Sequence, residues 1–349
     1  MKSQRTLRTA LFVLLAISTV LFTGAALAQD MPPLPGELIV GDLSAPRAIA
    51  FDDEGNLLVA VAGSGGEVTM TMASPEGESE MSIGMTGKII SVAPDGTVTD
   101  VIGAMPSYAA PMETMGVYRA IPHGDSLWVL YSGGGPATTG AFWQDSIVEL
   151  DPATLAVKHI INMNPIETEL DPDGNGYDSN VADIAWTADG ALLIVDAGSN
   201  ALFSWTAEGG IEVVAAWPSN DVPTSVEVAD NGDIYVGFLG AGIAPGAGKV
   251  ERWSNGELAE TFGGLTAVTD VLVDGETVYA VEMFLFGEQG PGPGDVLMLS
   301  ADGNTVVAGG LIAPFGLAKG PDGSIYVSFG TVAFAPGMTG GVVKLAPAM

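Results

Sequence analysis

A unit of four short strands recurs along most of this chain, and the repeat restricts the folds that are available to it. The clearest copy spans residues 268–311, and its apolar runs are separated by Asp-Gly turns, as antiparallel hairpins require. Further copies occupy residues 47–103, 118–163, 182–217 and 224–265. Four antiparallel strands repeated around an axis form a β-propeller. No segment after residue 30 has a helical pattern of apolar residues.

The two ends of the repeat region complement each other. The last copy, residues 315–346, contains only three strands, whereas GELIVGDLSAP (36–46) matches TVVAGGLIAP (305–314) in an earlier fourth strand. We therefore expect residues 37–43 to supply the outer strand of the last blade, which closes the ring and leaves no open seam. The sequence predicts an all-β, six-bladed β-propeller as a single domain over residues 36–349.

The first residues are typical of a secretory signal peptide. Lys2, Arg5 and Arg8 precede an apolar run, and Ala26-Leu27-Ala28 is a small-residue cleavage site. We expect residues 1–28 to be removed, residues 29–35 to act as a linker, and the mature protein to be extracellular or periplasmic. The alternative is an uncleaved membrane anchor. No later segment is apolar enough to span a bilayer.

Charge and composition exclude several classes of partner. The chain has 42 acidic and 11 basic residues and a formal net charge of -31, which argues against nucleic acids and anionic lipids. It has no cysteine and two histidines, which excludes disulfides and argues against multi-histidine metal sites. No dinucleotide or phosphate motif is present, so no organic cofactor is indicated.

Several sequence segments within the repeat are similar to those of a known protein family. The segments SAPRAIAFDDEGNLLVAVAGSGG (44–66), PDGNGYDSNVADIA (172–185) and LLIVDAGSNAL (192–202) resemble the ScyD/ScyE family of secreted, NHL-like propellers. The match continues to the closing APFGLAKGPDGSIYVSFG (313–330) and covers nearly all of the chain after residue 36. The resemblance implies a propeller fold and export, and it implies no particular chemistry.

Charged residues occupy the same position in the first strand of several copies of the repeat. Because the first strand of each blade lines the central channel, we expect Arg119, Asp183 and Asp270 to converge there, with Arg47 one position earlier. Arg47 and Arg119 are candidates for clamping an anionic ligand, and the alternative is a salt bridge between blades. Asp183 and Asp270 are the candidate catalytic carboxylates.

Two cation sites are predicted. Related propeller hydrolases of the gluconolactonase type hold a divalent cation at the channel mouth through Asp, Glu and Asn. Here Asp183, Asp270 and Asn180 would be ligands, with Asp178 and the ligand-binding candidate Glu282 nearby. The second is a calcium loop, because Asp171, Asp173 and Asn175 match the first half of such a motif. The alternative is that these side chains only shape turns.

Two functions are open at this point. In the first, the propeller binds a small molecule or an envelope protein at its channel mouth. In the second, a divalent cation such as Ca²⁺ supports a lactonase-like hydrolase or a biosynthetic enzyme that acts on a small carboxylate or aromatic substrate. The first is favoured, because the sequence contains no strong catalytic set and a fold does not determine chemistry.

Overall fold

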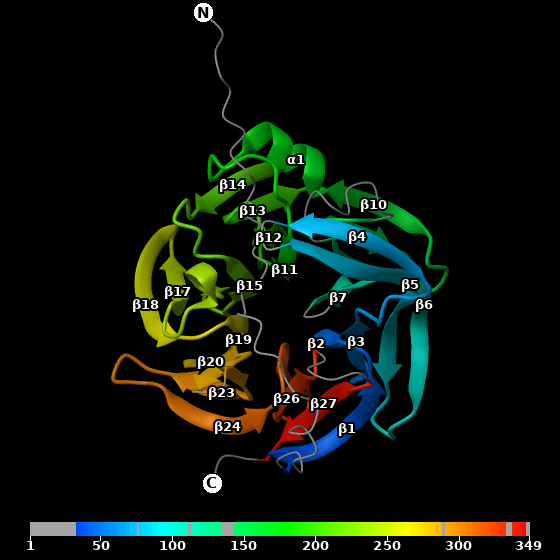
Figure 1. Cartoon of the computed structure of the whole chain (residues 1–349). Helices are drawn as coiled ribbons and strands as arrows, with labels where there is room; N and C mark the ends of the chain where they lie inside the picture. The colour runs from blue at the N-terminus through cyan, green and yellow to red at the C-terminus, as the bar shows by residue number, and fades with distance from the viewer. Residues whose placement is uncertain are drawn as a thin grey trace, which may run out of the picture.

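The computed structural model describes residues 33–74, 77–110, 113–133, 143–287, 290–332 and 337–346. The predicted signal peptide and residues 29–32 of the predicted linker lie outside this part of the chain. The fold is all-β, as predicted, and the sheets are arranged around a common centre (Figure 1). Within the described residues, no helix is long and apolar enough to cross a membrane.

Three four-stranded antiparallel sheets follow the predicted repeat closely. One contains β11 (Val181–Trp186), β12 (Leu192–Asp196), β13 (Ala201–Thr206) and β14 (Gly210–Ala216). The next contains β15 (Pro223–Val228), β16 (Ile234–Phe238), β17 (Gly248–Ser254) and β18 (Glu257–Leu265). The third contains β19 (Val268–Asp274), β20 (Thr277–Glu282), β23 (Gly294–Leu299) and β24 (Thr305–Leu311). The first strands β11, β15 and β19 lie nearest the centre (Figure 1).

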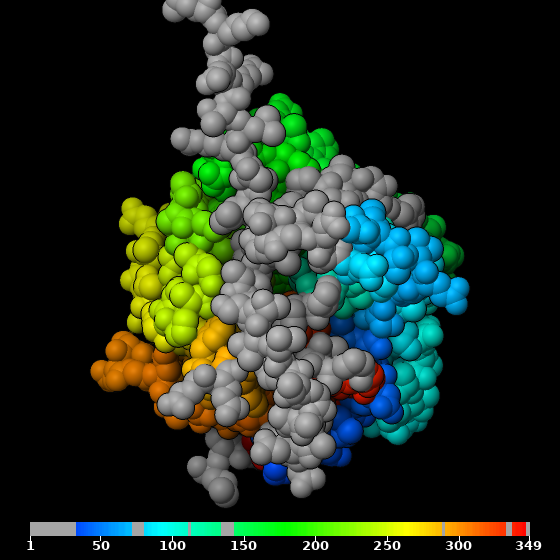
Figure 2. Space-filling view, in the orientation of Figure 1, coloured from blue at the N-terminus to red at the C-terminus, as the bar shows by residue number. Residues whose placement is uncertain are grey.

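The N-terminal part of the chain forms one nine-stranded sheet in place of two separate ones. Its strands are β2 (Pro46–Phe51), β3 (Leu57–Val61), β4 (Val68–Ser74), β5 (Gly77–Val92), β6 (Val98–Ala110), β7 (Glu113–His123), β8 (Ser126–Ser132), β9 (Ser146–Leu150) and β10 (Val157–Asn162). The two predicted units are joined because β6 pairs with β7 from Tyr108↔Met115 to Ala110↔Glu113. Tyr108 and Met115 pack into one apolar cluster, which draws these strands together. The hairpin β4–β5 forms an arm on the face shown in Figure 2.

The strand pairing expected between the two chain ends is present. The order of the remaining four-stranded sheet is β1 (Gly36–Leu43), β27 (Gly340–Leu345), β26 (Ile325–Phe329) and β25 (Leu317–Lys319). The strands β1 and β27 are antiparallel, with Gly36 opposite Leu345 and Leu43 opposite Gly340. The first and last strands of the described chain therefore share one sheet.

One α-helix was not expected from the sequence. It is α1 (Met163–Leu170), whose first turn is capped by the Asn162 side chain accepting from the Asn164 N–H at 3.0 Å. Burial of Met163 and Glu167 fixes the helix beneath the following loop. The smaller elements are η2 (Ala241–Ile243) and the hairpin of β21 (Leu285–Gly287) and β22 (Gly290–Gly292).

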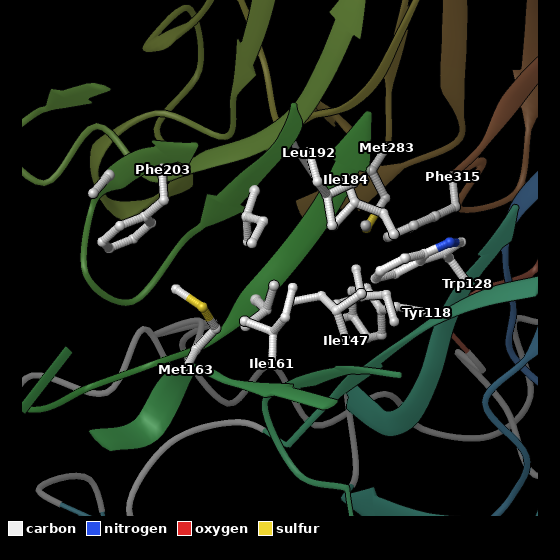
Figure 3. Packing of buried hydrophobic residues seen from close by; sticks show 14 of the residues in the cluster. Tyr118, Trp128, Ile147, Ile161, Met163, Ile184, Leu192, Phe203, Met283 and Phe315 are labelled. Carbon is white, nitrogen blue, oxygen red and sulfur yellow. The ribbon is translucent and has the colours of Figure 1, made fainter. Parts of the chain in front are cut away.

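The largest apolar cluster extends from the helix toward the centre of the molecule. Figure 3 shows Met163 and Phe203 at one end of this cluster and Tyr118 and Phe315 at the other. Tyr118 lies on β7, whereas Phe315 precedes β25 in the sheet that holds both chain ends. The cluster thus holds residues near the centre of the molecule in place through close-packed side chains.

Candidate functional site

Strands β7, β11 and β19, which belong to three different sheets, meet at Arg119. Its Nε donates to Asp183 Oδ1 at 2.6 Å, and its Nη2 lies 3.9 Å from Asp270 Oδ1. All three side chains are buried. The convergence of these residues, which the repeat alignment predicts, is therefore present, and it takes the form of a salt bridge between sheets.

The same two carboxylates also bind backbone amides of the next strands. Asp183 Oδ2 accepts the Val226 N–H on β15 at 2.9 Å, and Asp270 Oδ2 accepts the Leu317 N–H on β25 at 2.8 Å. Each Oδ1 accepts the N–H of its own following residue, Ile184 or Val271. All four carboxylate oxygens are engaged, so the cluster fastens neighbouring sheets together.

Glu227 joins this cluster, and the sequence analysis missed it. Burial, followed by the charges of Asp270 and Asp183, raises the pKa of Glu227 to about 8 against the opposing effect of Arg119. Burial likewise raises the pKa of Asp183 to about 7, although Arg119 lowers it. The available signal was an acidic residue between two valines of a strand, in Ser225-Val-Glu-Val228.

Arg47 occupies a different environment, one with little hydrogen bonding. Its guanidinium carbon lies 4.5 Å from the centroid of the Tyr118 ring and 4.9 Å from that of Phe315. Its Nη2 donates to the Thr114 carbonyl at 2.5 Å, and its buried Nε has no partner. In contrast to Arg119, Arg47 forms no salt bridge within the described residues.

The backbone around Arg47 is held firmly. The Ser328 hydroxyl donates to the Arg47 carbonyl at 2.7 Å and accepts from the Gly316 N–H at 2.8 Å. This links β2 to the sheet of β25 and β26. Glu113, at the exposed start of β7, is an acidic neighbour whose charge interacts with that of Arg47.

The remaining residues predicted for the channel cation site are bound elsewhere. Asn180 Oδ1 accepts from the Ser132 hydroxyl at 2.7 Å, and Glu282 Oε1 accepts from the Thr266 N–H at 2.6 Å. No three His, Asp or Glu side chains among the described residues form a group that could hold a metal ion. Asp183 and Asp270 do not fit a divalent cation, because the buried Arg119 already places a positive charge between them.

The predicted calcium loop binds its own backbone and side chains. Asp171 Oδ1 accepts the Gly176 N–H at 2.9 Å, and Asp173 accepts both the N–H and the side-chain amide of Asn175 at 2.9 Å. Asp173 also accepts from the Asn200 amide at 3.0 Å. These are the turn-shaping contacts of the alternative interpretation.

A second buried acidic cluster lies beside this loop, and the sequence analysis did not identify it as a group. It comprises Asp145, Glu167, Asp178 and Asp196, whose pKa values are raised by burial, to about 8 for Asp145, 9 for Glu167 and 7 for Asp178. Mutual repulsion adds to the rise, since Asp196 and Asp178 act on both Asp145 and Glu167.

The hydrogen bonding of this cluster is incomplete. Asp196 accepts from the Ser179 hydroxyl and the Asn180 N–H, and Glu167 Oε1 accepts the Asp178 N–H at 3.0 Å. By contrast, Asp145 Oδ2 and Glu167 Oε2 are buried without a partner. The four buried carboxyl groups form no salt bridge with a basic side chain within the described residues. Protons on these two oxygens would lower the desolvation cost of burying the cluster.

Comparison with known proteins identifies the fold and no family. No protein-family profile and no curated protein matches the chain. A gluconolactonase from Xanthomonas campestris is 12% identical, with a TM-score of 0.56, covering 92% of this chain and 93% of that chain. A glucose dehydrogenase-type oxidoreductase from Thermus thermophilus is 13% identical, with a TM-score of 0.54, covering 89% and 100%. A chain of the mitotic checkpoint complex is 13% identical, with a TM-score of 0.52, covering 91% and 98%. These likenesses show a β-propeller fold and carry no information about activity.

Proposed function

We propose that this protein is an exported, six-bladed β-propeller that binds a small ligand at the mouth of its central channel. The blade number is supported by the nine-stranded sheet, in which the units β2–β6 and β7–β10 are joined by the short β6–β7 pairing of three residues on each strand. The four remaining four-stranded sheets supply one blade each. The pairing of β1 with β27 supports a ring that is closed by the N-terminal strand.

The observation that carries the proposal is the different bonding of the two channel arginines. Arg119 serves as a structural bridge, because it forms ion pairs with the buried carboxylates of Asp183 and Asp270, which also bind backbone amides. A carboxylate that acts as a base or a metal ligand needs an accessible oxygen, whereas both of these carboxylates are buried and each of their oxygens already accepts a hydrogen bond. Arg47, in contrast, keeps unused donors beside two aromatic rings. This favours ligand binding over metal-dependent hydrolysis.

Export is inferred from the leader-like residues 1–28, and a small ligand is favoured over an envelope protein. Arg47 is only 3% exposed, so a broad protein surface cannot reach its unused donors, and a ligand that binds them must be small. The channel mouth is therefore the part of the molecule where we expect selectivity to arise.

Metal analysis and melting curves with and without a chelator test the proposal on the chain from residue 29 onward. We expect no stoichiometric divalent metal, no effect of the chelator, and a saturable melting-temperature increase with a small ligand without turnover. Lactone hydrolysis that requires a divalent metal, and that Asp183→Asn and Asp270→Asn both abolish, would instead establish the hydrolase.

A further inference from the structure

The unused hydrogen-bond donors of Arg47 indicate the chemical class of ligand. A guanidinium has five N–H donors in a rigid plane, and only the bond to the Thr114 carbonyl is made within the described residues. Leaving a buried donor such as Nε unpartnered costs free energy, which a suitable acceptor would recover. The position therefore favours a ligand that brings acceptor oxygens.

Charge strengthens this argument. The chain carries a formal net charge of -31, yet Arg47 is buried without a salt bridge to a described carboxylate. The acidic neighbour Glu113 lies at the exposed start of β7 and forms no salt bridge with Arg47 among the described residues. An external anion would complete the ion pair that the protein itself leaves incomplete.

The aromatic rings define how the ligand approaches. Tyr118 and Phe315 lie edge to face, with ring centroids 5.7 Å apart, and both contact the guanidinium of Arg47. Figure 3 shows the two side chains on the same side of the apolar cluster. Because the two rings pack against the guanidinium, a hydrogen-bond acceptor would approach its N–H edge. The two oxygens of a carboxylate match the spacing of the donors on that edge.

We propose that Arg47, with Tyr118 and Phe315, forms a subsite for the carboxylate of a small organic acid. This inference rests on the proposed function and specifies the ligand class. The bond from Ser328 to the Arg47 carbonyl and the bond from Arg47 to Thr114 hold the subsite between β2, β7 and β26. The carboxylate would receive two charge-assisted hydrogen bonds from the guanidinium, while the rest of the ligand contacts the rings.

Benzoate is the probe for this subsite, and calorimetry at constant ionic strength is the measurement. We expect saturable binding of benzoate and none of benzylammonium, with benzamide at least about tenfold weaker, because charge-assisted bonds are lost. Sodium sulfate separates a carboxylate subsite from general anion binding. Sulfate binding as tight as that of benzoate would contradict the proposal.

Variants assign the binding to Arg47. Arg47→Gln should weaken benzoate about tenfold or more, and Arg47→Lys should do nearly the same because the planar donor edge is lost. The matched control is Arg252→Gln on β17, where the arginine is paired with Asp233 at 3.0 Å and Glu260 at 3.3 Å, and benzoate affinity should be unchanged. Glu113→Gln should bind benzoate at least as tightly as the parent.

The outcomes separate this inference from the proposed function. Should neutral ligands bind the channel mouth of a folded parent that does not bind benzoate, the subsite is wrong and the binding function stands. Unchanged benzoate affinity in Arg47→Gln, or no benzoate binding to a folded parent, also overturns the subsite. Circular dichroism of each variant establishes that loss of binding is not loss of fold.

Discussion

The carboxylate of Asp270 accepts the backbone N–H of Leu317 at 2.8 Å and thereby joins β19 to the sheet that contains both chain ends. Asp183 does the same for Val226 on β15. In both cases an acidic residue at the channel bonds to the first strand of the following sheet. The charged column is therefore part of what holds the sheets in register around the centre.

Removing the Asp270 carboxylate should destabilise the protein strongly. Asp270→Ala leaves the buried Leu317 N–H unpaired and deprives Arg119 of one neighbour, so we expect unfolding free energy to fall by about 2–4 kcal/mol. Urea denaturation measures this loss. The control is Asp274→Ala on the same strand, whose exposed pair with Lys319 should contribute less than about 1 kcal/mol. Equal losses in the two variants would refute the bridging role.

Substitution of Arg119 should lower the unfolding free energy more than substitution of either of its acidic partners. Arg119→Met leaves Asp183 and Asp270 buried with no positive charge between them, and a loss of about 3–5 kcal/mol is expected. Adding Asp183→Asn and Asp270→Asn to this variant should restore part of the loss. Thermal and urea melts of the single and triple variants measure the coupling. A triple variant less stable than Arg119→Met would argue against charge burial as the cause.

The pairing of β1 with β27 should contribute to global stability. A Cβ atom on Gly36 would lie 2.0 Å from the Lys344 carbonyl oxygen, so Gly36→Val should displace the start of β1. We expect a lower melting temperature and faster amide exchange in Gly340–Leu345. Gly263→Val on β18, where the φ is not positive and no atom lies within 4 Å of the added Cβ, controls for a generic valine effect. Unchanged exchange in β27 would contradict a stabilising role for this pairing.

Stability should decrease as the pH rises from about 4 to 9. Burial raises the folded-state pKa of Asp145 to about 8 and of Glu167 to about 9, so between their unfolded and folded pKa values the folded state holds more protons. The stabilisation is complete below the unfolded pKa values and is lost as pH passes through the folded ones, by about 2 kcal/mol or more in total.

Urea denaturation at several pH values tests this dependence with one neutral variant. Glu167→Gln should flatten the decrease and be more stable than the parent at pH 9, since it removes a carboxylate that repels Asp196 and Asp178. Glu212→Gln, on an exposed part of β14, removes the same charge and should leave the slope unchanged. Identical slopes in Glu167→Gln and the parent would exclude this cluster as the source.

The repeat was sufficient to predict the strands of each unit and the charged residues near the centre, because both are determined by the position of a residue within the repeating unit. The match between residues 36–46 and 305–314 was enough to predict that β1 would pair with β27. Arg119, Asp183 and Asp270 were found for the same reason: equivalent positions in a repeat lie at equivalent distances from its axis.

Features that depend on contacts between units were not predictable in this way. Residues 106–116 contain two prolines and resemble a loop, yet Tyr108 and Met115 are drawn into a shared apolar cluster and extend the strands. The helix α1 is short and stabilised by burial of Met163 and Glu167, so it has little periodicity of its own. Its burial also brings Glu167 near Asp196, which is remote in sequence.

The shared sheet of β1 and β27 has a consequence during synthesis. The first strand leaves the ribosome about 300 residues before its partner, which at about 5–20 residues per second is a delay of about 15–60 s. Throughout this interval β1 is a nascent segment without its backbone hydrogen-bond partner and is open to pairing with other chains. The sheet that contains both strands can therefore be completed only after β27 has been synthesised, and any factor that shields β1 until then would raise the yield of correctly folded protein.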